Sequence, residues 1–158
     1  MPDGLDPLGA EWWWFLVDRH LDRMVAVVEE LGDDLVNATP EFPGANSPFQ
    51  IVFHCCGMLE WWTREAVLGI DAGRDRDAEF TASGSVPELM ARVDGVRRQL
   101  RADLAAMDLD GPLRGDPSDH YRDTPIGTSV RGVLLHVLEE IAQHHGHLEI
   151  TRDVIRGH

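Results

Sequence analysis

Four residues that can bind a metal ion or carry a proton recur at helical spacing near the C-terminus. They are His136, Glu140, His144 and His147, inside the run from Thr128 to Gly157. At about 100° per residue, their side chains would lie within an arc of about 80° on one face of a helix. The spacing therefore predicts a single stripe of possible ligands.

This stripe is expected to face the interior of the protein. Val133, Val137 and Ile141 each precede one of its members by three residues, so apolar side chains adjoin it. A carboxylate buried among imidazoles is costly to desolvate unless a cation or good hydrogen bonds compensate. The stripe thus indicates either a metal site or a network hydrogen-bonded across neighbouring helices, with His145 exposed on the opposite side.

His54 is a candidate third ligand from another helix. Ser47-Pro48-Phe49-Gln50 forms a capping box with proline at the first helical position, and His54 follows at the spacing of an inward face. Metal sites in helical bundles form where side chains of facing helices converge. His54 with the i, i+4 pair Glu140 and His144 would make a three-ligand site, whose open fourth position is typical of catalytic zinc. The ligand types also admit nickel, iron or manganese.

The apolar periodicity predicts four long helices and no strand, hence an all-α bundle forming a single domain over residues 1–158. The expected helices are Glu11–Leu35, Pro48–Leu68, Pro87–Met107 and one from Thr128 or Ser129 to Gly157. Trp12, Trp13 and Trp14 sweep about 200° of the first helix, so they cannot all face one core.

Two connections separate these helices. Gly69–Gly84 contains the charged run Arg74-Asp75-Arg76-Asp77 and is expected to be a solvated loop. Asp108–Gly127 is rich in proline and glycine, and a loop of this length often covers a site. We expect its two chemically active residues, His120 and Tyr121, to lie at the surface.

Composition excludes several classes of function. A formal charge of −14 without a basic cluster disfavours binding to nucleic acid or to an anionic membrane. No apolar run approaches the roughly 20 residues that a membrane span needs. Met1-Pro2-Asp3-Gly4 does not resemble a secretory signal, and the adjacent Cys55 and Cys56 are expected to be reduced thiols packed as small apolar side chains. A cytoplasmic protein is predicted.

Three segments, taken in order, resemble the DinB-like superfamily. They are Asn46–His54, Asp75–Phe80 and Glu139–His147. The pattern is closest to the actinobacterial branch near the mycothiol-dependent maleylpyruvate isomerases and mycothiol S-transferases. The resemblance implies an up-down-down-up four-helix bundle, usually a homodimer, that holds a divalent metal, most often zinc or nickel.

The ligand set implied by this resemblance is His54, Glu140 and His144, with His136, Gln143 and His147 lining the pocket or supporting the ligands. Many members carry two histidines followed by Gly-Gln on the fourth helix. Here Glu140 stands at the earlier position and His147 replaces the glutamine, so His147 is a possible competing ligand.

The function implied is a metal-dependent S-transferase or isomerase, in which mycothiol reacts as a metal-bound thiolate with a small electrophile. Two alternatives remain open: a non-catalytic, stress-associated protein that binds a metal or ligand, and a metal-dependent hydrolase. Consumption of an electrophile that requires a thiol would favour the transferase. The tryptophan cluster at Trp12–Trp14 suggests a homodimer.

Overall fold

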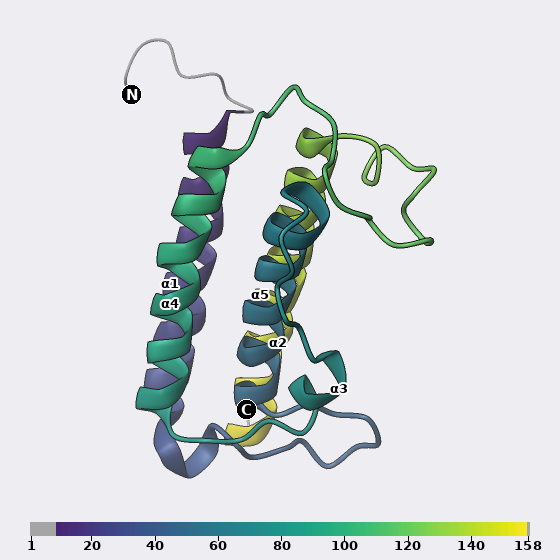
Figure 1. Ribbon diagram of the computed structural model, residues 1–158. Coiled ribbons are helices and arrows are strands. Elements are labelled where there is room, and N and C mark those ends of the chain that lie inside the picture. The colour runs from purple at the N-terminus through teal and green to yellow at the C-terminus, as the bar shows by residue number, and fades with distance from the viewer. Residues whose placement is uncertain (1–8, 158) are drawn as a thin grey trace.

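Four long helices form the frame of the molecule (Figure 1). The computed structural model describes residues 9–157, so the segment Met1–Gly4 lies outside the described residues. No strand occurs within residues 9–157, in agreement with the all-α prediction. The elements are α1 (Ala10–Leu35), α2 (Pro48–Glu60), η1 (Trp61–Val67), α3 (Arg76–Glu79), α4 (Val86–Ala106) and α5 (Val130–Arg156).

Local capping sets where α2, α4 and α5 begin and where α5 ends. The Ser47 hydroxyl accepts the amide of Gln50 at 3.2 Å, and the Gln50 side chain accepts the amide of Ser47 at 2.9 Å, which completes the predicted box. Ser85 caps α4 in the same way, and Ser129 caps α5. Gly157 ends α5 with a φ of 76°, a left-handed conformation that glycine adopts without a Cβ clash.

The second predicted helix changes type near its end. Residues Pro48–Glu60 are α-helical, but Trp61–Val67 form the π-helical segment η1. The connection between α4 and α5 supplies hydrogen bonds to the end of this segment, because the amides of Arg114 and Gly115 donate to the carbonyls of Val67 and Ala66 at 2.9 and 3.1 Å. Short π-helical segments often occur at functional sites.

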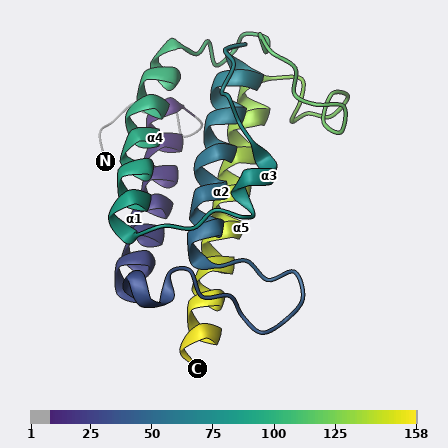
Figure 2. The ribbon, with the colours of Figure 1, turned by 60° about the horizontal axis from the view of Figure 1, so that its bottom comes forward.

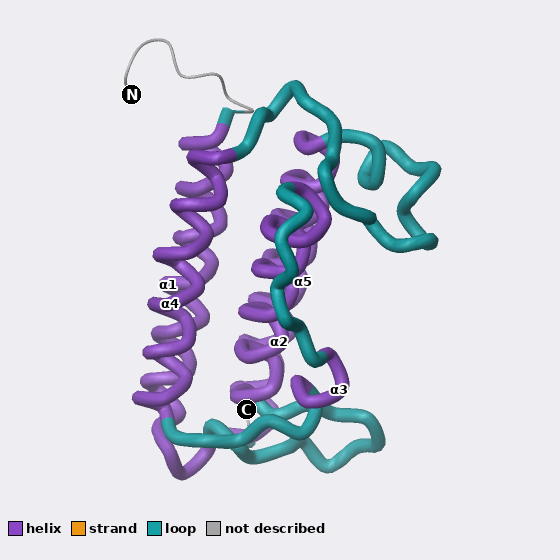
Figure 3. The backbone as a smooth tube through the Cα atoms, viewed as in Figure 1, coloured by secondary structure: helices purple, strands orange, loops and turns teal. Residues whose placement is uncertain are grey.

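The chain direction confirms the predicted topology. α1 and α5 run one way while α2 and α4 run the other, which is the up-down-down-up order (Figures 1 and 2). α1 packs on α5 and α4, and α2 packs on the same two helices. Residues 68–85 return along the outside of α2 and carry α3, and residues 107–129 extend beside the start of α5 (Figure 3).

The core fills the space between the four long helices. Leu21, Leu59, Leu100 and Ile141, one from each of them, are almost fully buried. Trp13 is buried and its indole N–H donates to the Leu134 carbonyl at 2.6 Å, which joins the start of α1 to α5. None of the described helices is long and apolar enough to cross a membrane.

Candidate metal centre

A cavity of about 900 Å³ follows the seam between α2 and α5. Its walls include His54 from α2 together with His136, Glu140, His144 and His147 from α5. Segments of the two long connections, near residues 71–80 and 118–121, form further parts of the wall. Five of the six candidate residues thus share one cavity, whereas Gln143 is exposed and does not line it.

The three predicted ligands lie close together. Glu140 Oε2 is 3.6 Å from His144 Nε2, one helical turn further along. The His54 and His144 rings meet edge to face with centroids 4.7 Å apart, and His136 Nε2 lies 3.9 Å from the other oxygen of Glu140. These contacts join α2 and α5 across the seam.

The electrostatics of the cluster favour an ionised Glu140 and neutral imidazoles at His54 and His147. The interaction with His144 is the main cause that lowers the pKa of Glu140, and His136 and His54 add to it against the opposing effect of burial. Burial lowers the pKa of His54 and of His147, although the hydrogen bond with Glu79 opposes this for His54. Near neutral pH each of these two imidazoles therefore keeps a lone pair that can bind a metal ion.

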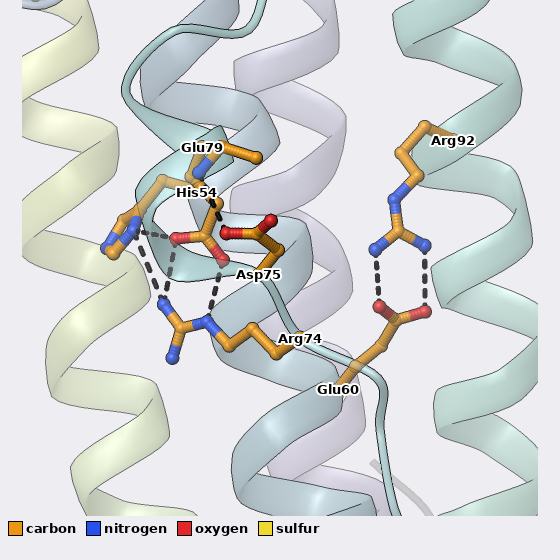
Figure 4. A network of polar contacts seen from close by, with 7 residues as sticks. His54, Glu60, Arg74, Asp75, Glu79 and Arg92 are labelled. Carbon is orange, nitrogen blue, oxygen red and sulfur yellow. Dashed lines mark hydrogen bonds and ion pairs between the residues drawn. The ribbon is translucent and has the colours of Figure 1, made fainter.

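His54 is held by a buried ion pair (Figure 4). Its Nδ1 lies 2.7 Å from Glu79 Oε2, and Arg74 donates to both Glu79 oxygens, from Nε at 2.6 Å and from a terminal nitrogen at 2.9 Å. Glu79 is only 2% exposed. Because a carboxylate can only accept, Nδ1 of His54 carries the proton and Nε2 keeps its lone pair.

This arrangement corrects the expectation that Gly69–Gly84 is a solvated loop. Asp75 caps the short helix α3 by accepting the amide of Ala78 at 3.0 Å, and α3 turns Glu79 inward. Gly57 makes room for it, since a Cβ there would overlap a Glu79 oxygen. In the sequence, the capping Asp75 was a signal of this turn, but nothing indicated that Glu79 would be buried beside His54.

The donor chemistry fits a divalent metal. As the side chains stand, no three His, Cys, Asp or Glu residues in the described part of the chain form a group that could hold a metal ion. In a tetrahedral site with metal–ligand bonds of about 2.0 Å, two ligand atoms lie roughly 3.3 Å apart. Glu140 Oε2 and His144 Nε2 are 3.6 Å apart, which is close to this distance. The orienting carboxylate behind His54 is also the usual partner of a metal-binding histidine.

The cavity differs in character between its two ends. What we call the aromatic end consists of Trp61, Trp62, Tyr121 and His136, and the polar end consists of Asn46, Gln50, Arg76 and His147. The candidate ligands lie between them. Tyr121, which we expected at the surface, is half-buried with its ring centroid 5.3 Å from that of Trp62. Its burial depends on where the long connection lies, which helical periodicity does not reveal.

His145 was expected to be exposed, and this is wrong. It is 5% exposed and its Nδ1 lies 3.1 Å from that of His20 on α1. The burial of the contact is the main cause that lowers the pKa of His20, and His145 adds to it. α5 packs on both α1 and α2, so two of its faces are buried rather than one.

Comparison with protein families identifies the relationship. The sequence matches the family described as Mycothiol-S-transferase over residues 15–157. The chain belongs to the mycothiol-S-transferase family. The match covers all four long helices except the first turn and a half of α1, and it confirms the branch of the DinB-like superfamily that the sequence motifs resemble. No curated protein matches the chain.

Proposed function

We propose that this protein transfers mycothiol to a small electrophile, with a divalent metal, zinc or nickel, held by His54, Glu140 and His144. The observation that carries the proposal is the meeting of these three donors in one cavity, with Glu140 and His144 3.6 Å apart and His54 oriented by Glu79. Membership of the mycothiol-S-transferase family supports the choice of thiol.

Each residue of the proposed site has a separate role. A divalent metal, when bound, supplies the positive charge that favours a deprotonated thiol at neutral pH. Glu79 keeps His54 in the tautomer that leaves Nε2 free, and Arg74 stabilises the buried charge of Glu79. His136 Nε2 lies 3.9 Å from Glu140 Oε1, so the Glu140 carboxylate has an imidazole neighbour on the side away from His144.

The proposed transfer is a substitution in which atoms and charges balance. The thiol sulfur gives an electron pair to the electrophilic carbon, a C–S bond forms, and the leaving group departs with the electrons of its bond. The thiol proton is released to solvent, which reaches the open cavity. The products are a thioether of mycothiol, the leaving group and a proton.

The two cysteines of the chain are poor nucleophiles. Burial raises the pKa of Cys56 to about 12 and also raises the pKa of Cys55. Both side chains are buried, so they remain protonated and out of contact with a substrate. This supports a reaction in which a thiol co-substrate, rather than a protein cysteine, attacks the electrophile.

Metal content and turnover test the proposal together. We expect untagged wild-type protein to bind about one zinc or nickel ion per chain and to consume monochlorobimane only when mycothiol is present. His54→Ala and His144→Ala should lose most of the metal and the activity while keeping their helical circular dichroism. Unchanged metal content in both variants would refute the ligand assignment, and turnover without any thiol would indicate a hydrolase instead.

We also propose that the protein is a homodimer that pairs α5 with its copy. Leu135, Ala142, Gly146 and Ile150 lie within about 80° on the outer face of α5. Leu135 and Ile150 are 55% and 66% exposed, and no atom lies within 4 Å of a Cβ built at Gly146. Exposed apolar residues with small residues between them support close packing of a second helix, with Glu139 and Asp153 on the same arc.

A further inference from the structure

The aromatic end of the cavity has no part in the proposed ligand set. We propose that it binds the electrophile, and that this substrate is a planar aromatic compound. The inference rests on the proposed function, because it assigns the second substrate of the same site. It is carried by the arrangement of the four rings and by their position beside Glu140.

The rings of the aromatic end are arranged around Trp62. The centroid of Trp62 lies 4.7 Å from that of Trp61 and 4.9 Å from that of His136, with planes inclined by 77° and 80°. Tyr121 meets the same ring at 70°. Edge-to-face contacts of this kind are favourable, and they turn ring faces and edges in different directions along the cavity wall. A further flat ring can therefore stack on one member and meet the edge of another.

The backbone presents two consecutive tryptophans to the same cavity. Successive side chains of an α-helix diverge by about 100°, so adjacent residues seldom line one pocket. Trp61 and Trp62 both do so from the start of the π-helical segment η1. Core packing accounts for Trp62, which is 5% exposed, but Trp61 is only half-buried. Its placement is better explained by contact with a ligand.

The aromatic end adjoins the candidate ligands directly. The His136 ring lies 4.8 Å from that of Tyr121, and its Nε2 is 3.9 Å from Glu140. A compound stacked at this end would hold its reactive carbon beside Glu140 and His144. His136 Nδ1 is buried, has no hydrogen-bond partner in the described part of the chain and lies 3.6 Å from Glu139 Oε2.

The opposite end suits the other substrate. Asn46, Gln50, Arg76 and His147 carry hydrogen-bonding groups, and Arg76 and His147 are exposed. A hydrophilic thiol would find more polar partners there than among the four rings. The two substrates would then reach the ligand cluster from opposite ends of the cavity.

Binding of two unreactive probes tests this assignment without turnover. We expect nitrobenzene to bind the full-length protein more tightly than nitrocyclohexane, which has a similar size and the same nitro group but no aromatic ring. Aromatic contacts of this kind correspond to a ratio of roughly 2- to 12-fold in Kd. Isothermal titration calorimetry on metal-free protein, with no thiol present, measures both constants.

Substitutions at Tyr121 test whether the preference for nitrobenzene arises at the aromatic end. Tyr121→Leu should remove most of the preference for nitrobenzene, whereas Tyr121→Phe, which keeps the ring, should retain it. Phe15→Leu is the matched control, because Phe15 is an exposed aromatic residue on α1 that does not line the cavity. Equal binding of the two probes by the wild type, or an unchanged preference in Tyr121→Leu, would overturn the proposal.

Steady-state kinetics separate this inference from the proposed function. With 1-chloro-2,4-dinitrobenzene and mycothiol, Tyr121→Leu should raise the KM for the aromatic substrate and leave the KM for the thiol near its wild-type value. The reverse pattern would assign the aromatic end to the thiol and overturn the inference. If no transfer occurs but the probe preference and its dependence on Tyr121 persist, the aromatic site stands and the proposed function falls.

Discussion

At the scale of single residues, the contact between Glu79 and His54 is where a buried charge would orient the proposed ligand. Glu79 lies 2.7 Å from His54 Nδ1 and is neutralised by Arg74. Carboxylates behind metal-binding histidines fix the ring and raise its basicity. We therefore expect Glu79→Gln to weaken zinc binding by roughly 10- to 100-fold, measured by competition with a chromophoric chelator.

The matched control is Glu60→Gln. Glu60 is also paired with an arginine, Arg92, but this pair joins α2 to α4 and does not touch His54 (Figure 4). Glu60→Gln should leave zinc affinity within about twofold of wild type while removing a similar carboxylate. Equal losses of affinity in the two variants would mean that the effect is one of general stability rather than of ligand orientation.

The two cysteines provide a second test at this scale. Because burial raises the pKa of both thiols, to about 12 for Cys56, they remain protonated at pH 8. Iodoacetamide should leave Cys55 and Cys56 unmodified in the native protein and alkylate both in guanidinium chloride, as mass spectrometry would record. Rapid native alkylation would make a protein thiol a candidate nucleophile and weaken the case for an external one.

At the scale of elements, the sequence predicted what depends on local signals. The caps at Ser47 and Ser85 and the glycine stop at Gly157 fixed the helix ends to within two residues. Helical periodicity also predicted that His54 and His144 each face inward, and the family resemblance paired them. It could not predict the burial of Glu79, because that depends on how the connection at residues 68–85 packs against α2.

Glycine at position 115 ties the second long connection to η1. Its amide donates to the Ala66 carbonyl at 3.1 Å, and a Cβ there would overlap the carbonyl oxygen of Glu65. Backbone atoms cannot move aside as a flexible side chain can. We expect Gly115→Ala to lower the free energy of unfolding by roughly 1–3 kcal/mol in chemical denaturation.

Gly95→Ala is the control for this prediction. Gly95 lies within α4, where a Cβ would meet no atom closer than 4.0 Å. The substitution should be neutral or stabilising by up to about 1 kcal/mol, because alanine favours the helix. If Gly115→Ala is equally well tolerated, the connection is not held against η1 by this close approach.

At the scale of the whole molecule, charge restricts how two copies can meet. A chain with a formal charge of −14 repels its own copy, so a stable dimer needs an uncharged contact. The stripe on α5 provides apolar residues for such a contact, and Glu139 and Asp153 lie on the same arc. A two-fold axis near Ala142 would set Leu135 of each copy opposite Ile150 of the other, which makes the stripe complementary to itself.

Substitution at Gly146 tests this arrangement with little effect on the subunit. A Cβ at Gly146 meets no atom within 4 Å, and arginine favours a helix more than glycine does, so Gly146→Arg should fold normally. In the dimer it would force a long charged side chain between closely packed helices. We expect sedimentation to show a dimer for the wild type and for Gly95→Arg, whose site lies on α4, but a monomer for Gly146→Arg. A wild-type monomer, or a Gly146→Arg dimer, would exclude α5 as the contact surface. If the Gly146→Arg monomer retains its metal, each subunit carries a complete site.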